Sequence, residues 1–105
     1  MNETGKQYVA STVIFFDTER DFGFITRMKG MPKDIYCRMA GRRKYRLKED
    51  GTFAFTDTVE RSDPVGGEMV IVHVEERRGR GPAAVKWSPV PKSLFERLPG
   101  NVVRG

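Results

Sequence analysis

A short aromatic motif, Asp21-Phe22-Gly23-Phe24-Ile25, carries the clearest chemical signal in the sequence. Alternate side chains of a strand point to opposite faces, so Phe22 and Phe24 share one face and the glycine between them points the other way. Each base stacked on an exposed ring contributes about 1 to 3 kcal/mol with little sequence discrimination. The pattern predicts a stacking surface for unpaired bases, made by Phe15, Phe22, Phe24, Tyr36 and Arg38.

The same rings are also candidates for the hydrophobic core, which is where an isolated strand phenylalanine usually lies. The chain has other apolar residues to fill an interior, namely Val13, Ile25, Ile35, Val70 and Val72. The two faces of these strands cannot both lie in the core. We therefore expect Phe22, Phe24 and Tyr36 to be substantially exposed on one outer face.

Positive charge is concentrated in blocks on either side of an acidic stretch, residues 49–76. Lys and Arg number 19 against 14 Asp and Glu, a formal net charge of +5 that favours a polyanionic partner. Basic side chains near a stacking surface hold phosphates and make binding fall with salt. The predicted phosphate contacts are Arg20, Arg42, Arg43, Lys44, Arg46, Arg78 and Arg80.

Short β-branched and aromatic runs must position these residues. We expect strands over residues 8–16, 22–26, 35–39, 69–74 and 83–87, because Gly, Pro and Asp clusters separate those runs. Helical spacing is confined to residues 93–98. The fold class is all-β, and five strands favour a small closed barrel.

Three segments in fixed order resemble the cold-shock domain family. They are Thr12-Val13-Ile14-Phe15-Phe16-Asp17, Arg20-Asp21-Phe22-Gly23-Phe24-Ile25-Thr26 and Asp34-Ile35-Tyr36-Cys37-Arg38-Met39. Residues 75–85 also look like the family's last hairpin. The resemblance spans about residues 11–87. It implies a five-stranded antiparallel OB-type barrel that binds single-stranded RNA or DNA without catalysis, as an RNA chaperone or transcript regulator.

The chain departs from the family pattern at several positions. Ile14-Phe15-Phe16 stands where the family usually has Lys-Trp-Phe, Arg20-Asp21 replaces Lys-Gly, and Arg38-Met39 replaces His-Phe. These changes predict binding with an altered base preference. The segment between the third strand and Met69 is also longer than in minimal members, and this extended loop is expected to add contacts or a hairpin.

The expected organisation is an N-terminal extension (1–7), a cold-shock-like barrel (8–87) and a Pro-containing C-terminal tail (88–105). The polar N-terminus lacks the apolar core of a signal peptide, which predicts a cytoplasmic protein. No window approaches the roughly 18 apolar residues of a membrane span, so no membrane partner is expected.

The sequence offers no motif for catalysis, a cofactor, a small-molecule substrate or a metal site. His73 and Cys37 are the single His and the single Cys of the sequence, which is too few for a Cys/His metal site. Both are expected to be structural, with Cys37 pointing inward and Trp87 packing in the core.

A second interpretation remains open. The barrel is then a protein-interaction module within a larger complex, with the acidic stretch and the Leu94-Phe95 pair of the C-terminal tail contacting a protein partner. The choice between RNA and single-stranded DNA also remains open, because stacking does not read the 2′-hydroxyl.

Overall fold

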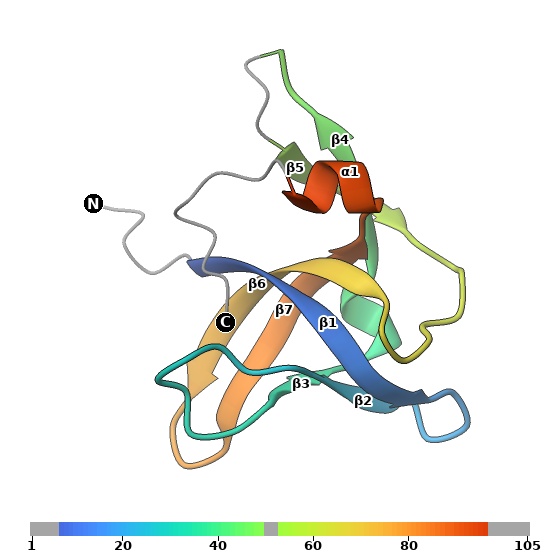
Figure 1. The fold of residues 1–105 in the computed structure, drawn as a ribbon. Helices are drawn as coiled ribbons and strands as arrows, with labels where there is room; N and C mark the ends of the chain where they lie inside the picture. The colour runs from blue at the N-terminus through green and yellow to red at the C-terminus, as the bar shows by residue number, and fades with distance from the viewer. Residues whose placement is uncertain (1–6, 50–52, 97–105) are drawn as a thin grey trace.

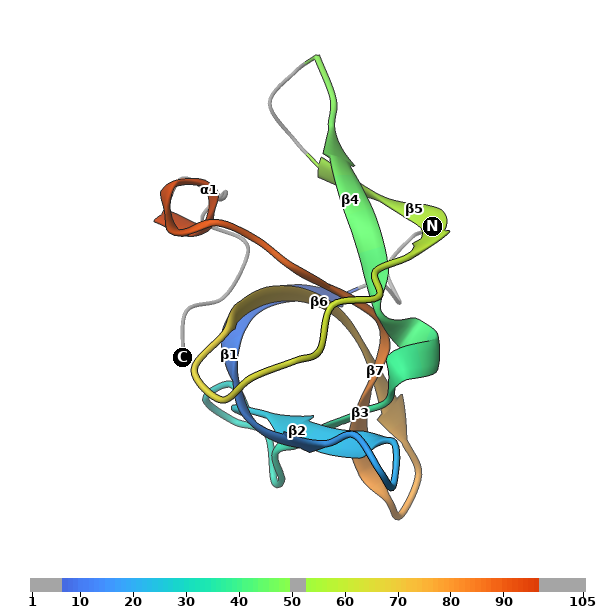
Figure 2. The ribbon, with the colours of Figure 1, turned by 90° about the vertical axis from the view of Figure 1, so that its right-hand side faces the viewer.

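A computed structural model describes residues 7–49 and 53–96. Five strands close a barrel in the order β1-β2-β3-β7-β6, and β4 and β5 form a separate two-stranded sheet outside it (Figures 1 and 2). The elements are β1 (Gln7–Asp17), β2 (Phe22–Ile25), β3 (Ile35–Cys37), the 3-10 helix η2 (Met39–Gly41), β4 (Arg43–Leu47), β5 (Phe53–Val59), β6 (Met69–Arg77), β7 (Gly81–Pro89) and α1 (Lys92–Glu96).

The predicted all-β class and the five-stranded OB-type barrel are confirmed, with one correction to the strand directions. The β1–β2, β1–β6, β2–β3 and β6–β7 pairs are antiparallel, but β3 pairs with β7 in parallel through Tyr36 and Ala83. Around a closed ring, strand directions can alternate throughout only when the number of strands is even. A closed barrel of five therefore needs at least one parallel pair, and an entirely antiparallel one cannot form.

The barrel interior is filled by the inward residues of its strands. Val9, Val13, Ile25, Ile35, Cys37, Val70, Val72, Val74 and Trp87 are buried together in one cluster. The inward positions predicted for Cys37 and Trp87 are confirmed. Because the interior is filled without Phe22, Phe24 or Tyr36, these rings are left on the outer surface.

The predicted extended loop contains the β4–β5 hairpin, which packs on the outside of the barrel. Ala10, Ile71 and Val90 form a second buried cluster there, contacted by Tyr45, Phe53, Phe55, Met69, Leu94 and Phe95. Leu94 and Phe95, considered above as a contact for a protein partner, are thus half-buried within the molecule. Helix α1 ends at Glu96, and residues 97–98 of the expected helix lie outside the described residues, as do residues 1–6 of the expected extension.

Within the part of the chain that the structure describes, no helix is long and apolar enough to span a membrane. The same residues contain no group of three or more His, Cys, Asp or Glu side chains arranged to hold a metal ion.

Candidate nucleic-acid interface

Four aromatic rings from three neighbouring strands lie together on the outer face of the barrel. Strand register brings them into line, because Phe24 is the cross-strand partner of both Phe15 on β1 and Tyr36 on β3. Ring centroids are 5.9 Å apart for Phe15–Phe24 and for Phe24–Tyr36, and 6.0 Å apart for Phe22–Phe24. We call these residues, Phe15, Phe22, Phe24 and Tyr36, the aromatic platform.

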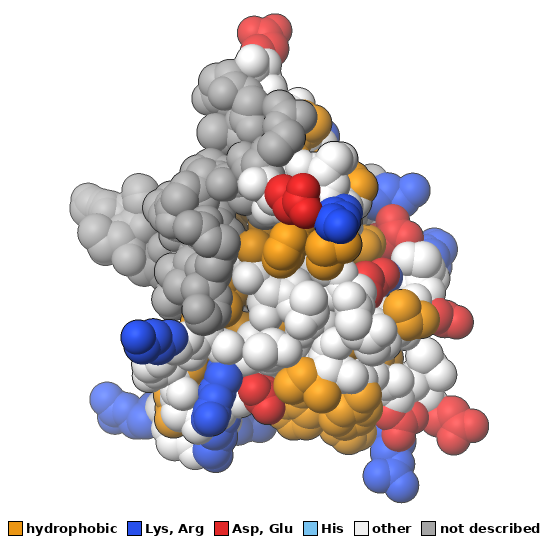
Figure 3. Space-filling model, in the orientation of Figure 1, with side chains coloured by type: hydrophobic (Ala, Val, Ile, Leu, Met, Phe, Trp, Pro, Cys, Tyr) orange, Lys and Arg blue, Asp and Glu red, His pale blue; other side chains and the backbone are white. Residues whose placement is uncertain are grey.

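The exposure of the platform rings is lower than the sequence suggested. Phe15 is 43% exposed, whereas Phe22, Phe24 and Tyr36 are half-buried. The cause is the packing of the rings against one another, since Phe22 meets both Phe15 and Phe24 edge to face, at interplanar angles of 85° and 87°. Figure 3 shows a hydrophobic patch at the lower end of the molecule, in the region of β1 and β2.

A bulge in β1 is what places Phe15 on the platform. Val13 and Phe15 are two positions apart, so an unbroken strand would direct both side chains to the same face. The β1–β2 register shifts between Val13 and Phe15, and past that point Phe15 is exposed while Phe16 packs against the core and Trp87. An extra residue in one strand of a pair re-aims the side chains that follow it.

Gly23 lets β1 and β2 approach closely beneath the platform. A Cβ atom at this position would collide with the carbonyl oxygen of Phe15 and would lie 2.6 Å from Cδ2 of Phe16. Neither the backbone nor a packed ring can give way cheaply. The glycine between Phe22 and Phe24 is therefore required by the strand packing that aligns the rings.

Asp21 holds Arg38 at one margin of the platform. Its carbonyl oxygen accepts a hydrogen bond from Arg38 Nε at 3.2 Å, and its Oδ2 accepts one from Nη2 at 3.3 Å. Oδ1 also accepts a bond from the Met39 N–H at 2.9 Å. Asp21 adopts φ of 58°, a left-handed conformation that Asp tolerates better than most residues. Arg38 thus lies beside the rings, as expected, but it is paired with an acid.

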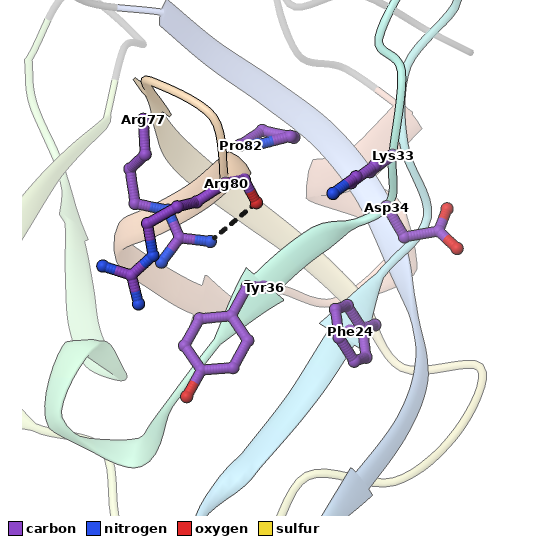
Figure 4. Close-up of a pocket in the computed structure, with 7 residues that line it drawn as sticks. All are labelled: Phe24, Lys33, Asp34, Tyr36, Arg77, Arg80 and Pro82. Carbon is purple, nitrogen blue, oxygen red and sulfur yellow. Dashed lines mark hydrogen bonds between the residues drawn. The ribbon is translucent and has the colours of Figure 1, made fainter.

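Two hollows lie beside Tyr36, between β3 and the turn that joins β6 to β7. The first, of about 490 Å³, is lined by Phe24, Lys33, Asp34, Tyr36, Arg77, Arg80 and Pro82 (Figure 4). The second, of about 400 Å³, is lined by Tyr36, Arg38, Ala40, Gly41, Arg77, Arg80, Ala83, Ala84 and Val85. Tyr36, Arg77 and Arg80 border both hollows, so the two hollows share one aromatic ring and two cations.

Arg77, the first residue of the basic segment 77–80, is also a member of this site. Its guanidinium lies over the Tyr36 ring, 5.2 Å from the centroid, and donates to the carbonyl oxygens of Gly81 and Arg80 at 3.1 and 3.4 Å. It therefore ties the β6–β7 turn to the platform. Lys33, which lines the first hollow, is not among the phosphate contacts predicted from the sequence.

The prediction that Arg42 contacts phosphate is wrong. Its side chain is fully buried, with Nη1 and Nη2 bonded to the two carboxylate oxygens of Glu68 at 2.9 and 3.0 Å. Nε and Nη2 also donate to the carbonyl and hydroxyl oxygens of Ser62, and the guanidinium packs 4.8 Å from the Trp87 ring centroid. With every donor nitrogen occupied inside the protein, Arg42 is a structural residue.

The other predicted phosphate contacts are spread over the molecule. Arg78 and Arg80 are both exposed in the β6–β7 turn, but only Arg80 lines the two hollows, so the structure does not bring Arg78 to the site. Arg20 is exposed beside Asp17, 3.8 Å from it. Arg43 is half-buried and donates to the carbonyl oxygens of Ala40 and Arg42. Lys44 and Arg46 are exposed on β4, which lies away from β2 and β3 in both ribbon views (Figures 1 and 2). The structure therefore does not bring those two residues to the platform.

Comparison with known proteins gives no match, either to a family model or to a curated protein.

Proposed function

We propose that the barrel binds single-stranded nucleic acid without catalysing a reaction. Bases stack on the aromatic platform, and the cations beside it, Lys33, Arg77 and Arg80, hold the phosphates. The observation that carries the proposal is the platform itself, four contiguous rings on the outside of a barrel whose core is complete without them. The motif resemblance to cold-shock domains supports the same conclusion, and with it a role in RNA chaperoning or transcript regulation in the cytoplasm.

The composition of the surface around the platform favours a binding role over a purely structural one. Contiguous apolar surface left on a protein generally marks an interaction site, because single exposed apolar residues are common but clusters are not. Here the patch is aromatic and is bordered by Lys33, Arg77 and Arg80, which make no ion pair within the described part of the chain. Aromatic surface with adjacent positive charge is the combination that sequence-tolerant single-strand binding requires.

The proposal is tested by fluorescence anisotropy with short labelled single-stranded RNA, single-stranded DNA and a duplex, on the parent protein and on Phe22→Ala and Phe24→Ala. Losing one stacked base costs about 1 to 3 kcal/mol, so each substitution should weaken single-strand binding about 5- to 150-fold. Duplex should bind more weakly, because its bases are not free to stack. The matched control is Phe95→Ala, which removes another half-buried ring, on α1, away from the platform.

Thermal melts on the same variants separate binding from folding. A fully buried Phe cut to Ala costs about 3 to 5 kcal/mol of stability, and these half-buried rings should cost less. Collapsed stability with unchanged affinity would mean that the rings are structural and that the proposal is wrong. Equal weakening by Phe95→Ala would also defeat it.

A further inference from the structure

The second of the two hollows lies at the seam of the barrel, where β3 and β7 run in parallel, and we call it the seam hollow. The two strands pair at Tyr36 and Ala83, and the next β-bridge between these segments joins Arg42 and Trp87. Between these points the chain detours through η2. The detour opens the hollow of about 400 Å³ between η2 and β7.

The lining of the seam hollow combines a floor of small residues with arginine side chains. The small residues are Ala40, Gly41, Ala83 and Ala84. Gly41 packs so closely on β7 that a Cβ atom there would lie 2.7 Å from the carbonyl oxygen of Val85. Tyr36 is the only aromatic side chain in the lining, so the hollow offers little for a base to stack on.

Positive charge is concentrated at this hollow. Arg38, Arg77 and Arg80 line it, and its described lining contains no Asp or Glu. Arg38 is partly neutralised by Asp21. Arg77 donates hydrogen bonds to carbonyl oxygens, not to a carboxylate, and the described residues provide no hydrogen bond or ion pair to the Arg80 side chain. Glu75 and Glu76, which precede Arg77, are exposed, and neither makes an ion pair within the described residues.

A phosphate group has the chemistry that matches this lining. The planar guanidinium presents paired donors that fit phosphate oxygens, and such charge-assisted bonds are about twice as strong as neutral ones. We propose that the seam hollow binds a phosphate of the nucleic-acid strand, next to the nucleotide whose base stacks on Tyr36. This inference rests on the proposed function. The phosphate site would define the path of the nucleic-acid strand, from the platform across Tyr36 to the barrel seam.

The test compares Arg80→Gln with Arg78→Gln. Both changes remove one exposed arginine from the same turn, but only Arg80 lines the hollow, so Arg78→Gln is the matched control. The measurement is the slope of log K against log salt for a short single strand. Each phosphate contact contributes about 0.7 to that slope for single strands. Arg80→Gln should lower it by about 0.7, and Arg78→Gln should leave it unchanged, as should Phe24→Ala.

Oligonucleotides with and without a terminal phosphate identify the source of the bound group. If the hollow takes an internal phosphodiester, a terminal phosphate leaves the affinity of the parent protein unchanged. If it takes a terminal phosphate, phosphorylated strands bind more tightly to the parent protein and not to Arg80→Gln. Either result supports the site when the slope change is present.

The inference and the proposed function fail in different ways. Equal slopes for the parent protein and Arg80→Gln, or an equal fall in Arg78→Gln, would overturn the seam site while the loss of affinity in Phe24→Ala still upheld the platform. If no single strand binds at all, the proposed function fails. Inorganic phosphate then tests the hollow alone, because a ligand of the folded state should raise the Tm of the parent protein more than that of Arg80→Gln. Equal rises would refute the phosphate site.

Discussion

Replacing Arg42 with methionine should lower stability without altering how binding depends on salt. The substitution removes a buried guanidinium that makes two hydrogen bonds to Glu68 and two to Ser62. Losing one partner of a buried pair costs about 3 to 5 kcal/mol, because the other charge is left uncompensated. The Glu68 side chain is 19% exposed and can recruit water, and methionine keeps the packing against Trp87. We therefore expect about 3 kcal/mol.

That loss corresponds to a fall in Tm of about 12 to 24 °C, at about 4 to 8 °C per kcal/mol for a domain of this size. Thermal and urea unfolding, followed by circular dichroism, measure it directly. The matched control is Arg38→Met, which breaks an arginine–carboxylate pair whose side chains are 57% and 39% exposed. Exposed pairs contribute about 0 to 1 kcal/mol, so its Tm should fall by only a few degrees.

A double variant adds a further check on the reasoning. In Arg42→Met with Glu68→Gln no charge is left unpaired, so part of the lost stability should return. If Arg42→Met melts like the parent protein and instead reduces the salt slope, then Arg42 reaches the ligand and the structural assignment is refuted.

Two further predictions concern the thiol and the hairpin. Burial, the largest influence, raises the pKa of the Cys37 thiol from 9.0 to about 12. The stability gained by keeping the thiol neutral is therefore complete below pH 9 and is lost as pH rises from there through about 12. Cys37→Ala should show a shallower alkaline loss of stability in urea titrations at several pH values, and an equally steep loss would contradict this. For the hairpin, replacing both Lys44 and Arg46 with Gln should change the affinity for a short single strand less than two-fold, because β4 lies away from the platform. A ten-fold loss in anisotropy titrations would place these residues in the site.

The barrel strands were predictable because their signals are local. Alternating apolar residues and turn residues identify each strand without knowledge of its neighbours, and the five predicted runs overlap the five barrel strands. The β4–β5 hairpin was harder to predict, since β4 alternates Lys and Arg with Tyr and Leu and has no β-branched residue. Its packing partners, including Val90 and Phe95, lie far away in the sequence.

The site was predictable where strand alternation decides the direction of a side chain, and not where distant contacts decide it. Phe22, Phe24 and Tyr36 share a face by alternation and by the pairing of β2 with β3. Phe15 joins them only through a bulge, which the sequence does not announce. The sequence around Arg42 does not distinguish it from its basic neighbours, because its acidic partner, Glu68, is 26 residues away.

The odd number of barrel strands connects the topology to the proposed binding site. The parallel pair falls at the β3–β7 seam, where a single pair of residues, Tyr36 and Ala83, joins the two strands. The antiparallel β6–β7 hairpin reaches this seam with Arg77 and Arg80 at its turn. In consequence, the last ring of the platform and its nearest cations meet where the barrel wall is least continuous. In the proposed complex, a nucleic-acid strand leaving the platform over Tyr36 would meet the guanidinium groups of Arg77 and Arg80 at the seam hollow.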